Sequence, residues 1–456
     1  MPVFSRTQNK SLYIFRRDLR LEDNTALLCA LKESESVLPA FIFDPAQADK
    51  TKNEYFSENA FGFMIDSLNE LDNELQKLGT HLYVFHGNPV EVITRLIKEE
   101  SISAVYVNKD YTPFSIKRDS EIQSECNQQG ITFKQFADTL LNEPEDALKQ
   151  DGKPYTIFTP YWKNASKIFV NAPQINNFNN YYSGKISFEE KVISPPHNAL
   201  RIKSGRPPAL NILKNISGLK NYETERDFPS IEGTSKLSTH LKFGTVSVRE
   251  VYYAISAKLG DTHPLLRQLY WRDFFHHIAY HFPKVFGHSF NDKYENVKWN
   301  SSDALFEKWK NGTTGFPIVD AGMRELNATG YMHNRVRMVV ASFLTKDLHI
   351  DWRRGEKYFA QQLVDYDPCL NNGNWQWAAS TGCDAQPYFR IFNPWRQQER
   401  FDAECIYIKK WIPELNDVAP KTIHSLYKNT LNNYPQPIVE HSEESKEAIA
   451  RYKAAI

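Results

Sequence analysis

The sequence predicts an α/β domain with a parallel sheet flanked by helices, joined by a long linker to a large all-α domain. Up to about residue 137, short apolar runs alternate with helical stretches, a pattern typical of a parallel sheet covered on both faces. From about residue 206 the periodicity is helical and strand signals are few. We therefore expect an α/β domain at 1–137, a linker at 138–205 and a helical domain at 206–456.

The α/β domain is expected to contain four short buried strands. The strands are expected at 11–17, 37–43, 81–85 and 104–107, and the helices between them at 24–32, 61–78 and 89–99. Ligands of parallel sheets tend to bind where strands end. The polar and aromatic residues there are Phe43, Asp44, Asn108, Lys109 and Asp110, which could equally be ordinary loop residues. No G-x-G-x-x-G motif follows the first strand, so the dinucleotide-binding fingerprint is absent.

Prolines and asparagines mark the linker, which includes the asparagine-rich run 176–180. We expect it to wrap over the surface with partial order. Helical periodicity then predicts helices at 248–259, 265–281, 321–329 and 332–348.

Composition limits the kind of protein. The chain has 456 residues, and eight of its nine tryptophans lie at or after Trp271, so aromatic side chains concentrate in the helical part. Lys+Arg and Asp+Glu are both 55, which argues against a protein coated in positive charge for non-specific nucleic-acid binding. A local basic patch is still compatible with this balance.

The five cysteines are scattered without a C-x-x-C pair, so we expect neither a metal site nor a disulfide framework, and a reducing compartment fits. The N-terminus lacks an apolar signal segment, and no run approaches the roughly 20 apolar residues of a membrane span. These features predict a cytoplasmic protein without a membrane partner.

Four stretches of the helical part could bind a ligand. The first is Thr234, Ser235, Lys236, Leu237 and Ser238, where hydroxyls and a lysine precede a helix. Helix N-terminal amides with hydroxyl donors can cradle a phosphate, although a plain N-cap would have the same residues. The second places Gln268, Trp271, Arg272 and Phe275 on one helix face, where a core helix would have aliphatic side chains.

The third stretch contains Asn334 and Met338, which share a helix face. Arg337 needs a partner because an unpaired buried charge is costly, and Asp365 or Asp367 could supply it. We expect Arg335 to point elsewhere, towards solvent or a polyanion.

The fourth stretch is 371–377, in which Trp375 and Trp377 lie among amides and small residues. With Asp365 and Asp367 upstream and Arg390 downstream, it is typical of a site for a flat ligand. A buried aromatic helix with a polar cap is the alternative. Spacing alone does not show whether Trp299, Trp352 and Trp375 meet.

Together these segments resemble the photolyase/cryptochrome family over nearly the whole chain. The resemblance rests on the opening 15–24 (FRRDLRLEDN), on 271–275 (WRDFF), on 315–338 and on 371–394. It implies an α/β antenna domain, a linker and a helical domain that holds FAD. The FAD contacts that it implies are Tyr222, Thr234, Ser235, Lys236, Leu237, Ser238, Arg337, Asp365, Tyr366, Asp367 and, near flavin N5, Asn371.

The resemblance also implies roles in catalysis and DNA binding. Trp375, Trp352 and Trp299 match the family's electron-transfer chain, in that order from flavin to surface, and Gln268, Asn334 and Asn371 complete the catalytic set. The residues that match positions lining the lesion pocket or holding DNA are Arg226, Trp271, Arg272, Asn334, Arg335, Met338, Trp377, Arg390 and Gln397. Among these, Arg226, Arg272, Arg335 and Arg390 are the expected phosphate contacts.

The implied activity is light-driven repair of cyclobutane pyrimidine dimers, by electron transfer from excited FADH⁻ to a flipped-out dimer in UV-damaged DNA. The (6-4) photolyases carry two histidines where this chain has Asn334 and Met338, which cannot exchange a proton as imidazole does. An asparagine at the Asn371 position resembles photolyases rather than plant or insect cryptochromes, and we expect no signalling tail. The closest resemblance is to class I or archaeal-type dimer photolyases, and a cryptochrome-type photoreceptor is the alternative.

One departure is Gln268, where class I photolyases have a glutamate that steadies the dimer radical anion. An amide can donate and accept hydrogen bonds but cannot titrate, so we expect repair with a reduced quantum yield. The resemblance further implies a monomer with a second, antenna chromophore, which could be a folate, a deazaflavin or a flavin.

Overall fold

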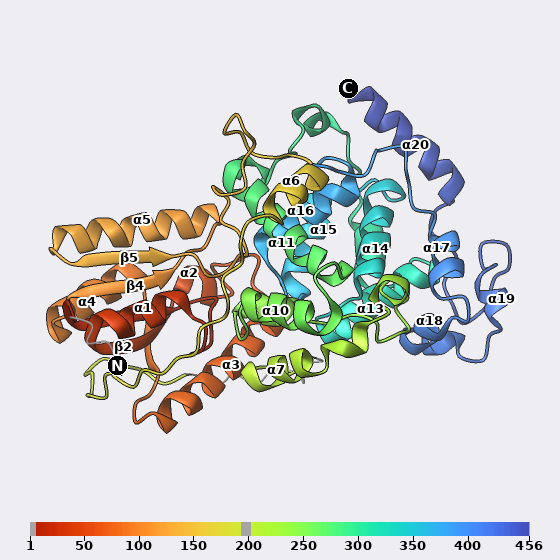
Figure 1. The fold of residues 1–456 in the computed structure, drawn as a ribbon. Helices are drawn as coiled ribbons and strands as arrows, with labels where there is room; N and C mark the ends of the chain where they lie inside the picture. The colour runs from red at the N-terminus through yellow and green to blue at the C-terminus, as the bar shows by residue number, and fades with distance from the viewer. Residues whose placement is uncertain (1–5, 193–201, 456) are drawn as a thin grey trace. The chain divides into compact units, whose positions relative to one another are not determined.

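The structure is a computed structural model that describes residues 6–192 and 202–455 (Figure 1). It contains two compact units that alternate along the chain. The first unit comprises Met1–Tyr155, Thr159–Gly218 and Ser235–His281, and the second comprises Thr156–Phe158, Leu219–Thr234 and Phe282–Ile456. Residues 193–201 of the predicted linker lie outside the described residues.

The first unit is built on a five-stranded, wholly parallel sheet with the order β3-β2-β1-β4-β5. Its strands are β1 (Gln8–Phe15), β2 (Ser34–Phe43), β3 (Tyr83–His86), β4 (Ala104–Asn108) and β5 (Thr132–Phe136). The connecting helices are α1 (Thr25–Glu33), α2 (Pro45–Ala48), α3 (Glu58–Lys77), α4 (Pro89–Glu100) and α5 (Pro113–Gln128). The predicted parallel sheet with helices is therefore confirmed.

The alternation of side chains along β1 divides the two faces of the sheet. Leu12 and Ile14 join an apolar cluster with α4 and α5, which supply residues such as Ile93 and Ile122. Tyr13 points the other way, and its hydroxyl donates 2.8 Å to Asn24, the N-cap of α1. Helices thus cover both faces, as a parallel sheet requires.

The predicted strands and helices agree with the structure to within a few residues, but α2, α5 and β5 of the sheet and its connecting helices were not predicted. The strand expected at 11–17 ends at Phe15. Beyond it, Arg16 pairs with Asp119 at 2.8 Å and Arg17 pairs with Asp110 at 3.2 Å. Both arginines therefore have charged partners on α5 or the loop before it.

Residues of the predicted linker that the structure describes form backbone hydrogen bonds with strands of the sheet. The amide of Val37 in β2 donates 2.9 Å to the Asn180 carbonyl, and the Tyr182 amide donates 2.7 Å back to the Val37 carbonyl. The Glu190 amide donates 2.8 Å to the carbonyl of Val84 in β3. The linker therefore supplies hydrogen-bond partners to two strands.

Helices complete the first unit. Most of α6 (Phe158–Ala165) belongs to it, with α7 (Arg206–Lys214), α9 (Ser238–Phe243), α10 (Val248–Leu259) and α11 (Pro264–His281). A short 3-10 helix, η1 (Ile216–Leu219), follows α7. The capping box of Ser247 and Glu250 fixes the start of α10 at the predicted residue.

Apart from the isolated bridge between Asn300 and Ile350, the regular elements described in the second unit are all helices. Its α-helices are α8 (Tyr222–Glu225), α12 (Asp303–Lys310), α13 (Pro317–Thr329), α14 (Asn334–Lys346), α15 (Trp352–Gln362), α16 (Pro368–Ala379), α17 (Pro394–Phe401), α18 (Ile406–Trp411), α19 (Pro420–Ile423) and α20 (His441–Ala454). Its 3-10 helices are η2 (Pro283–Val285), η3 (Asp292–Asn296) and η4 (Pro413–Leu415).

One apolar cluster forms the core of the second unit, and α13 to α16 contribute much of it. The last helix, α20, is attached by polar contacts to residues that follow α14. His441 lies 2.5 Å from Asp347, and His349 lies 2.7 Å from Glu444. Among the helices that the structure describes, none has the length and apolar character needed to span a membrane.

Candidate functional site

Helix α16 carries the stretch 371–377, and its start is set by Asp367. This N-cap carboxylate accepts hydrogen bonds from the amides of Cys369 at 3.0 Å and Leu370 at 3.1 Å, and Pro368 occupies the first helical position. Asp367 therefore lies at the N-terminus of α16, where the helix dipole and the free amides favour a carboxylate.

Three side-chain amides hold α16 in place. Asn371 donates 3.0 Å from Nδ2 to the Glu356 carbonyl of α15. Asn372 and Gln376 both donate 3.0 Å to the Val285 carbonyl, and Gln376 also donates 3.0 Å to Asn372. Asn372 and Gln376 were not predicted, because their amides contact backbone that lies almost 90 residues away in the sequence.

Glu356 is a buried carboxyl group that the sequence reasoning missed. It is 6% exposed, and burial raises its pKa to about 7, although the hydrogen bond from Asn372 at 3.5 Å partly opposes the shift. Because its own backbone carbonyl holds Asn371, this titratable group lies next to a predicted cofactor contact.

Arg337 has the buried partner that the sequence required. Its Nη2 lies 3.0 Å from Asp365 Oδ2, and its Nε donates 2.8 Å to the Met332 carbonyl. Burial, the largest single effect, would lower the pKa of Arg337, but the charge of Asp365, its hydrogen bond and the charges of Tyr331 and Glu325 together raise it. Of the two aspartates left open by the sequence, the structure assigns Asp365 to this pair.

The three predicted relay tryptophans all belong to the core of the second unit. Trp352 is fully buried, Trp375 is 2% exposed, and Trp299 packs against the same cluster. The rings of Trp375 and Trp309 lie 6.2 Å apart between centroids. Trp309 was not predicted as a site residue, and its role in this cluster is visible only in three dimensions.

The prediction that Asn334 and Met338 share one face of α14 is confirmed. Asn334 Nδ2 lies 3.7 Å from Met338 Sδ. Arg335 differs from its prediction, since it does not simply point towards solvent. Its guanidinium pairs with Asp227 at 2.8 Å, stands 4.4 Å from the ring centre of Phe401, and its side chain is only 17% exposed.

The remaining predicted residues of the second unit lie on several elements. Tyr222 is buried in α8, and the Arg226 guanidinium lies 5.6 Å from its ring centre. Arg390 is exposed on a loop. The half-buried members of this set are Thr234, Tyr366, Trp377 and Gln397.

In the first unit, residues 235–237 lead into the six-residue helix α9, which begins at Ser238. Lys236 has a φ of 55°, and the Leu237 amide donates 3.4 Å to Ser235 Oγ. The alternative, that the hydroxyl side chains serve only to cap the helix, is wrong. The N-cap residue is Leu237, and no side chain makes a capping hydrogen bond there. The exposed Ser238 begins the helix.

Helix α11, which also belongs to the first unit, carries the predicted ligand-binding face of Gln268, Trp271, Arg272 and Phe275. Trp271 and Phe275 stack with ring centres 5.7 Å apart, and Gln268 is half-buried. Arg272 is buried, and its Nη1 donates 2.7 Å to the Thr139 carbonyl. This structural use argues against the predicted phosphate contact of Arg272, because phosphate binding would require a desolvated guanidinium to leave its backbone partner.

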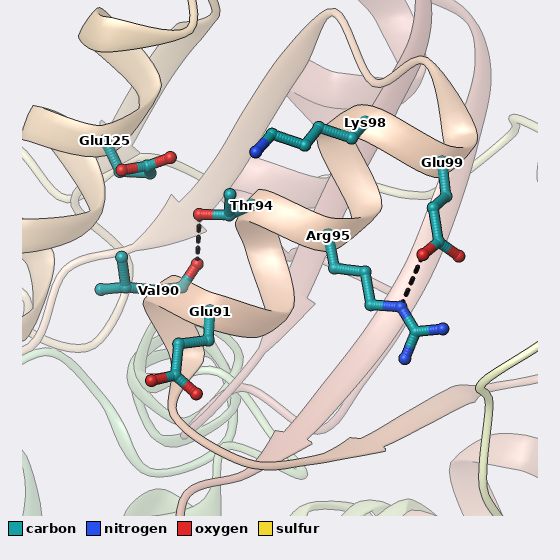
Figure 2. A pocket seen from close by; sticks show the side chains of 7 residues that line it. All are labelled: Val90, Glu91, Thr94, Arg95, Lys98, Glu99 and Glu125. Carbon is teal, nitrogen blue, oxygen red and sulfur yellow. Dashed lines mark hydrogen bonds and ion pairs between the residues drawn. The ribbon is translucent and has the colours of Figure 1, made fainter.

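A surface hollow of about 470 Å³ lies on α4 and α5 of the first unit (Figure 2). Its charged groups include Arg95, which pairs with Glu99 at 2.7 Å, one helical turn away. None of the residues predicted to bind cofactor or DNA lines this hollow. It is a solvated helix face with mixed charges.

Comparison with known proteins agrees with this arrangement. Residues 11–176 match the DNA photolyase family, and residues 265–454 match the FAD binding domain of DNA photolyase. The deoxyribodipyrimidine photo-lyase of Alkalihalophilus pseudofirmus is 38% identical, with 96% of this chain and 97% of the relative covered.

Two solved structures have a closely similar fold. An archaeal photolyase from Sulfolobus tokodaii, described as containing two FAD molecules, is 45% identical with a TM-score of 0.90, covering 98% of this chain and 100% of that one. A cryptochrome from Synechocystis sp. PCC6803 is 28% identical with a TM-score of 0.87, covering 97% and 99% of the two chains. Both family matches, the full-length relative and the shared fold lead to one conclusion: the chain belongs to the DNA photolyase family and carries its FAD-binding domain.

Proposed function

We propose that this protein repairs cyclobutane pyrimidine dimers in DNA by light-driven electron transfer from reduced FAD. The full-length similarity to a relative named deoxyribodipyrimidine photo-lyase carries the proposal. The Asn334–Met338 contact supports it further, because neither side chain can serve as the acid–base imidazole expected for (6-4) repair.

The donor set of the second unit fits a flavin. Arg337 is a half-buried cation fixed by the buried Asp365, which suits a ring system that becomes negatively charged when reduced. Asn371 has its Nδ2 bonded to Glu356, so its Oδ1 faces away from that bond and can accept from an N–H group such as flavin N5–H. We propose Tyr222, Thr234, Tyr366 and Asp367 as further contacts, with 235–238 of the first unit for the phosphate and ribose region.

When bound, reduced FAD would supply light-driven one-electron chemistry, with the electron returned once the two cyclobutane bonds of the dimer are broken. The protein's residues position and tune this exchange. Arg337 stabilises negative charge, and Asn371 orients a hydrogen bond at the N5 edge. Trp299, Trp352 and Trp375 are proposed to pass electrons inward when the cofactor has to be reduced.

We propose that residues of the first unit and residues of the second unit take part in DNA recognition. Trp271 and Trp377 offer flat faces on which an extruded base can stack, and Gln268 offers an amide for hydrogen bonding. Asn334 and Met338 would line the lesion. The cations and amide proposed to hold the strand are Arg226, Arg335, Arg390 and Gln397.

A second chromophore is proposed for the first unit, at the carboxyl ends of β2 and β3. Phe43 and His86 stack there with ring centres 4.7 Å apart, and Phe61 lies 6.2 Å from Phe43. Such an aromatic group suits a flat ligand. Because the Sulfolobus tokodaii photolyase is described with two FAD molecules, we propose a flavin in preference to a folate or deazaflavin. Chromatography of the extracted pigments tests this: flavin alone is expected, and folate or deazaflavin would contradict it.

The decisive experiment measures dimers in UV-irradiated oligo-dT incubated with the purified, FAD-loaded protein under blue light. We expect dimers to be lost in the light and to persist in a dark control. A protein that binds FAD and responds to light but leaves all dimers intact would contradict repair and favour a cryptochrome-type photoreceptor. The three-part domain division, the monomeric state and the cytoplasmic location remain predictions.

A further inference from the structure

We propose that Asp227 acts as an internal substitute for a DNA phosphate on Arg335 and thereby weakens binding to every duplex. The inference rests on the proposed function, in which Arg335 contacts the DNA backbone. The inference adds to that function a residue, Asp227, that sets how tightly the protein binds DNA. All the groups involved belong to the second unit.

The Arg335 guanidinium is held in one place by two contacts. Arg335 is the second residue of α14 and directly follows Asn334, a predicted lesion contact. Its Nη2 lies 2.8 Å from Asp227 Oδ1, and its guanidinium carbon lies 4.4 Å above the Phe401 ring at the end of α17. An arginine between a carboxylate and an aromatic face has little rotational freedom, so the group is oriented before any ligand arrives.

The residue that follows Asp227 packs on the same aromatic ring. Asp227 follows Arg226, the C-cap of α8, and precedes Phe228. The rings of Phe228 and Phe401 meet edge to face with centres 5.9 Å apart. Because Phe401 contacts both the arginine and the neighbour of the aspartate, the ion pair is built into the packing between α8, α14 and α17.

The chemistry of the pair allows exchange with a phosphate. Carboxylate and phosphate oxygens are both acceptors for the guanidinium fork. The Arg335 and Asp227 side chains are 17% and 35% exposed, so the pair is neither sealed in the interior nor freely solvated. A pair of this kind stabilises weakly enough for a polyanion to displace it. Each DNA molecule that uses Arg335 must first displace Asp227, which lowers its affinity.

The test is the affinity of the FAD-loaded Asp227→Asn variant for DNA, measured by fluorescence anisotropy at one salt concentration. Duplexes with and without a single dimer are compared. We expect both affinities to rise together, by about two- to fivefold. In an Arg335→Ala background the same substitution should have no effect, because the group that Asp227 restrains is missing.

Asp303→Asn is the matched control. Asp303 pairs with Arg354 at 2.6 Å and is 86% exposed, so the variant makes the same change in net charge at another, more solvated Asp–Arg pair. We expect a smaller rise or none. Asp227→Glu keeps the carboxylate and should retain the affinity of the unaltered protein. If Asp227→Asn fails to fold or to bind FAD, Asp227→Ser removes the charge in the same way and is expected to give the same rise.

Three results would overturn the inference: no rise in affinity, an equal rise in the Asp303→Asn control, or a rise that persists without Arg335. Failure of the proposed function gives a different result. In that case Arg335→Ala leaves DNA affinity unchanged and light leaves the dimers intact. If Arg335→Ala weakens binding while Asp227→Asn changes nothing, only the role of Asp227 is refuted.

Discussion

At the scale of single residues, Glu356 links pH to stability. Its pKa is about 7 in the folded protein and about 4.5 when unfolded, so between these values the folded state binds the extra proton. Stability therefore falls as pH rises from 4.5 to 7 and is level above that. We expect Glu356→Gln to remove this loss and to be more stable at pH 8 by up to about 3 kcal/mol.

Denaturant unfolding at pH 5 and pH 8 measures the effect. Glu307→Gln is the control, because it makes the same substitution at a carboxylate that is 55% exposed, and it should keep the pH dependence of the unaltered protein. An equal pH dependence in Glu356→Gln and in the unaltered protein would contradict the assignment of the proton to this residue.

We expect Gln268 to limit how efficiently each photon is used. An amide can hydrogen-bond a dimer but cannot supply a proton, whereas a carboxyl group can. We expect Gln268→Glu to raise the repair yield per absorbed photon. The yield is measured with saturating substrate, since a new carboxylate also repels DNA. An unchanged or lower yield would show that the amide is not limiting.

Residues whose partners follow from the cost of burial were predictable from the sequence. An arginine in the apolar stretch of α14 needed an anion, and Asp365 supplies it. Asp227 and Glu356 were not predictable in this way. Their importance comes from the neighbours that the fold gives them, namely Phe401 beside the Arg335 pair and a dry environment around Glu356.

At the scale of elements, the crossing of α15 and α16 depends on Gly355. A Cβ atom at this position would lie 2.2 Å from Trp375 Cη2 and 2.5 Å from Leu344 Cδ2. We expect Gly355→Ala to destabilise the fold by about 1–3 kcal/mol through overpacking, although alanine favours a helix.

Gly218→Ala is the matched control, because no atom lies within 4 Å of its added Cβ. It should be neutral or slightly stabilising. Thermal unfolding compares the two variants, and equal melting temperatures would show that Trp375 and Leu344 can move aside.

Elements with a strong burial signal were predicted, and weakly buried ones were missed. β5 is an outer strand in which none of the five residues is fully buried, so its sequence lacks the apolar run that marks β1 or β4. α5 buries few apolar side chains, among them Ile122 and Cys126, so its helical periodicity is faint.

At the scale of the whole molecule, the formal charge of zero means that DNA affinity must come from local cations. We expect Arg335→Ala to weaken binding to damaged and undamaged duplexes alike. The slope of log affinity against log salt should become shallower by about 0.9, the value for one lost phosphate contact. Selective loss for the damaged duplex would contradict a backbone role.

The division into compact units is a property of the whole chain that composition does not reveal. Residues 219–234 belong to the second unit, yet the chain returns to the first unit for 235–281. Composition changes gradually along this region, while contacts between distant residues decide which segments pack together. The sequence therefore indicated the fold class of each half but not this alternation.

The linker segment along β2 and β3 has a consequence for colloidal behaviour. β3 is an outer strand, and β2 extends past it at Val37. Open backbone groups at such places can recruit strands from other molecules. The bonds from Asn180, Tyr182 and Glu190 occupy part of these groups. Loosening the linker, for example by proteolytic cleavage before Asn180, should therefore promote aggregation even where unfolding has not begun.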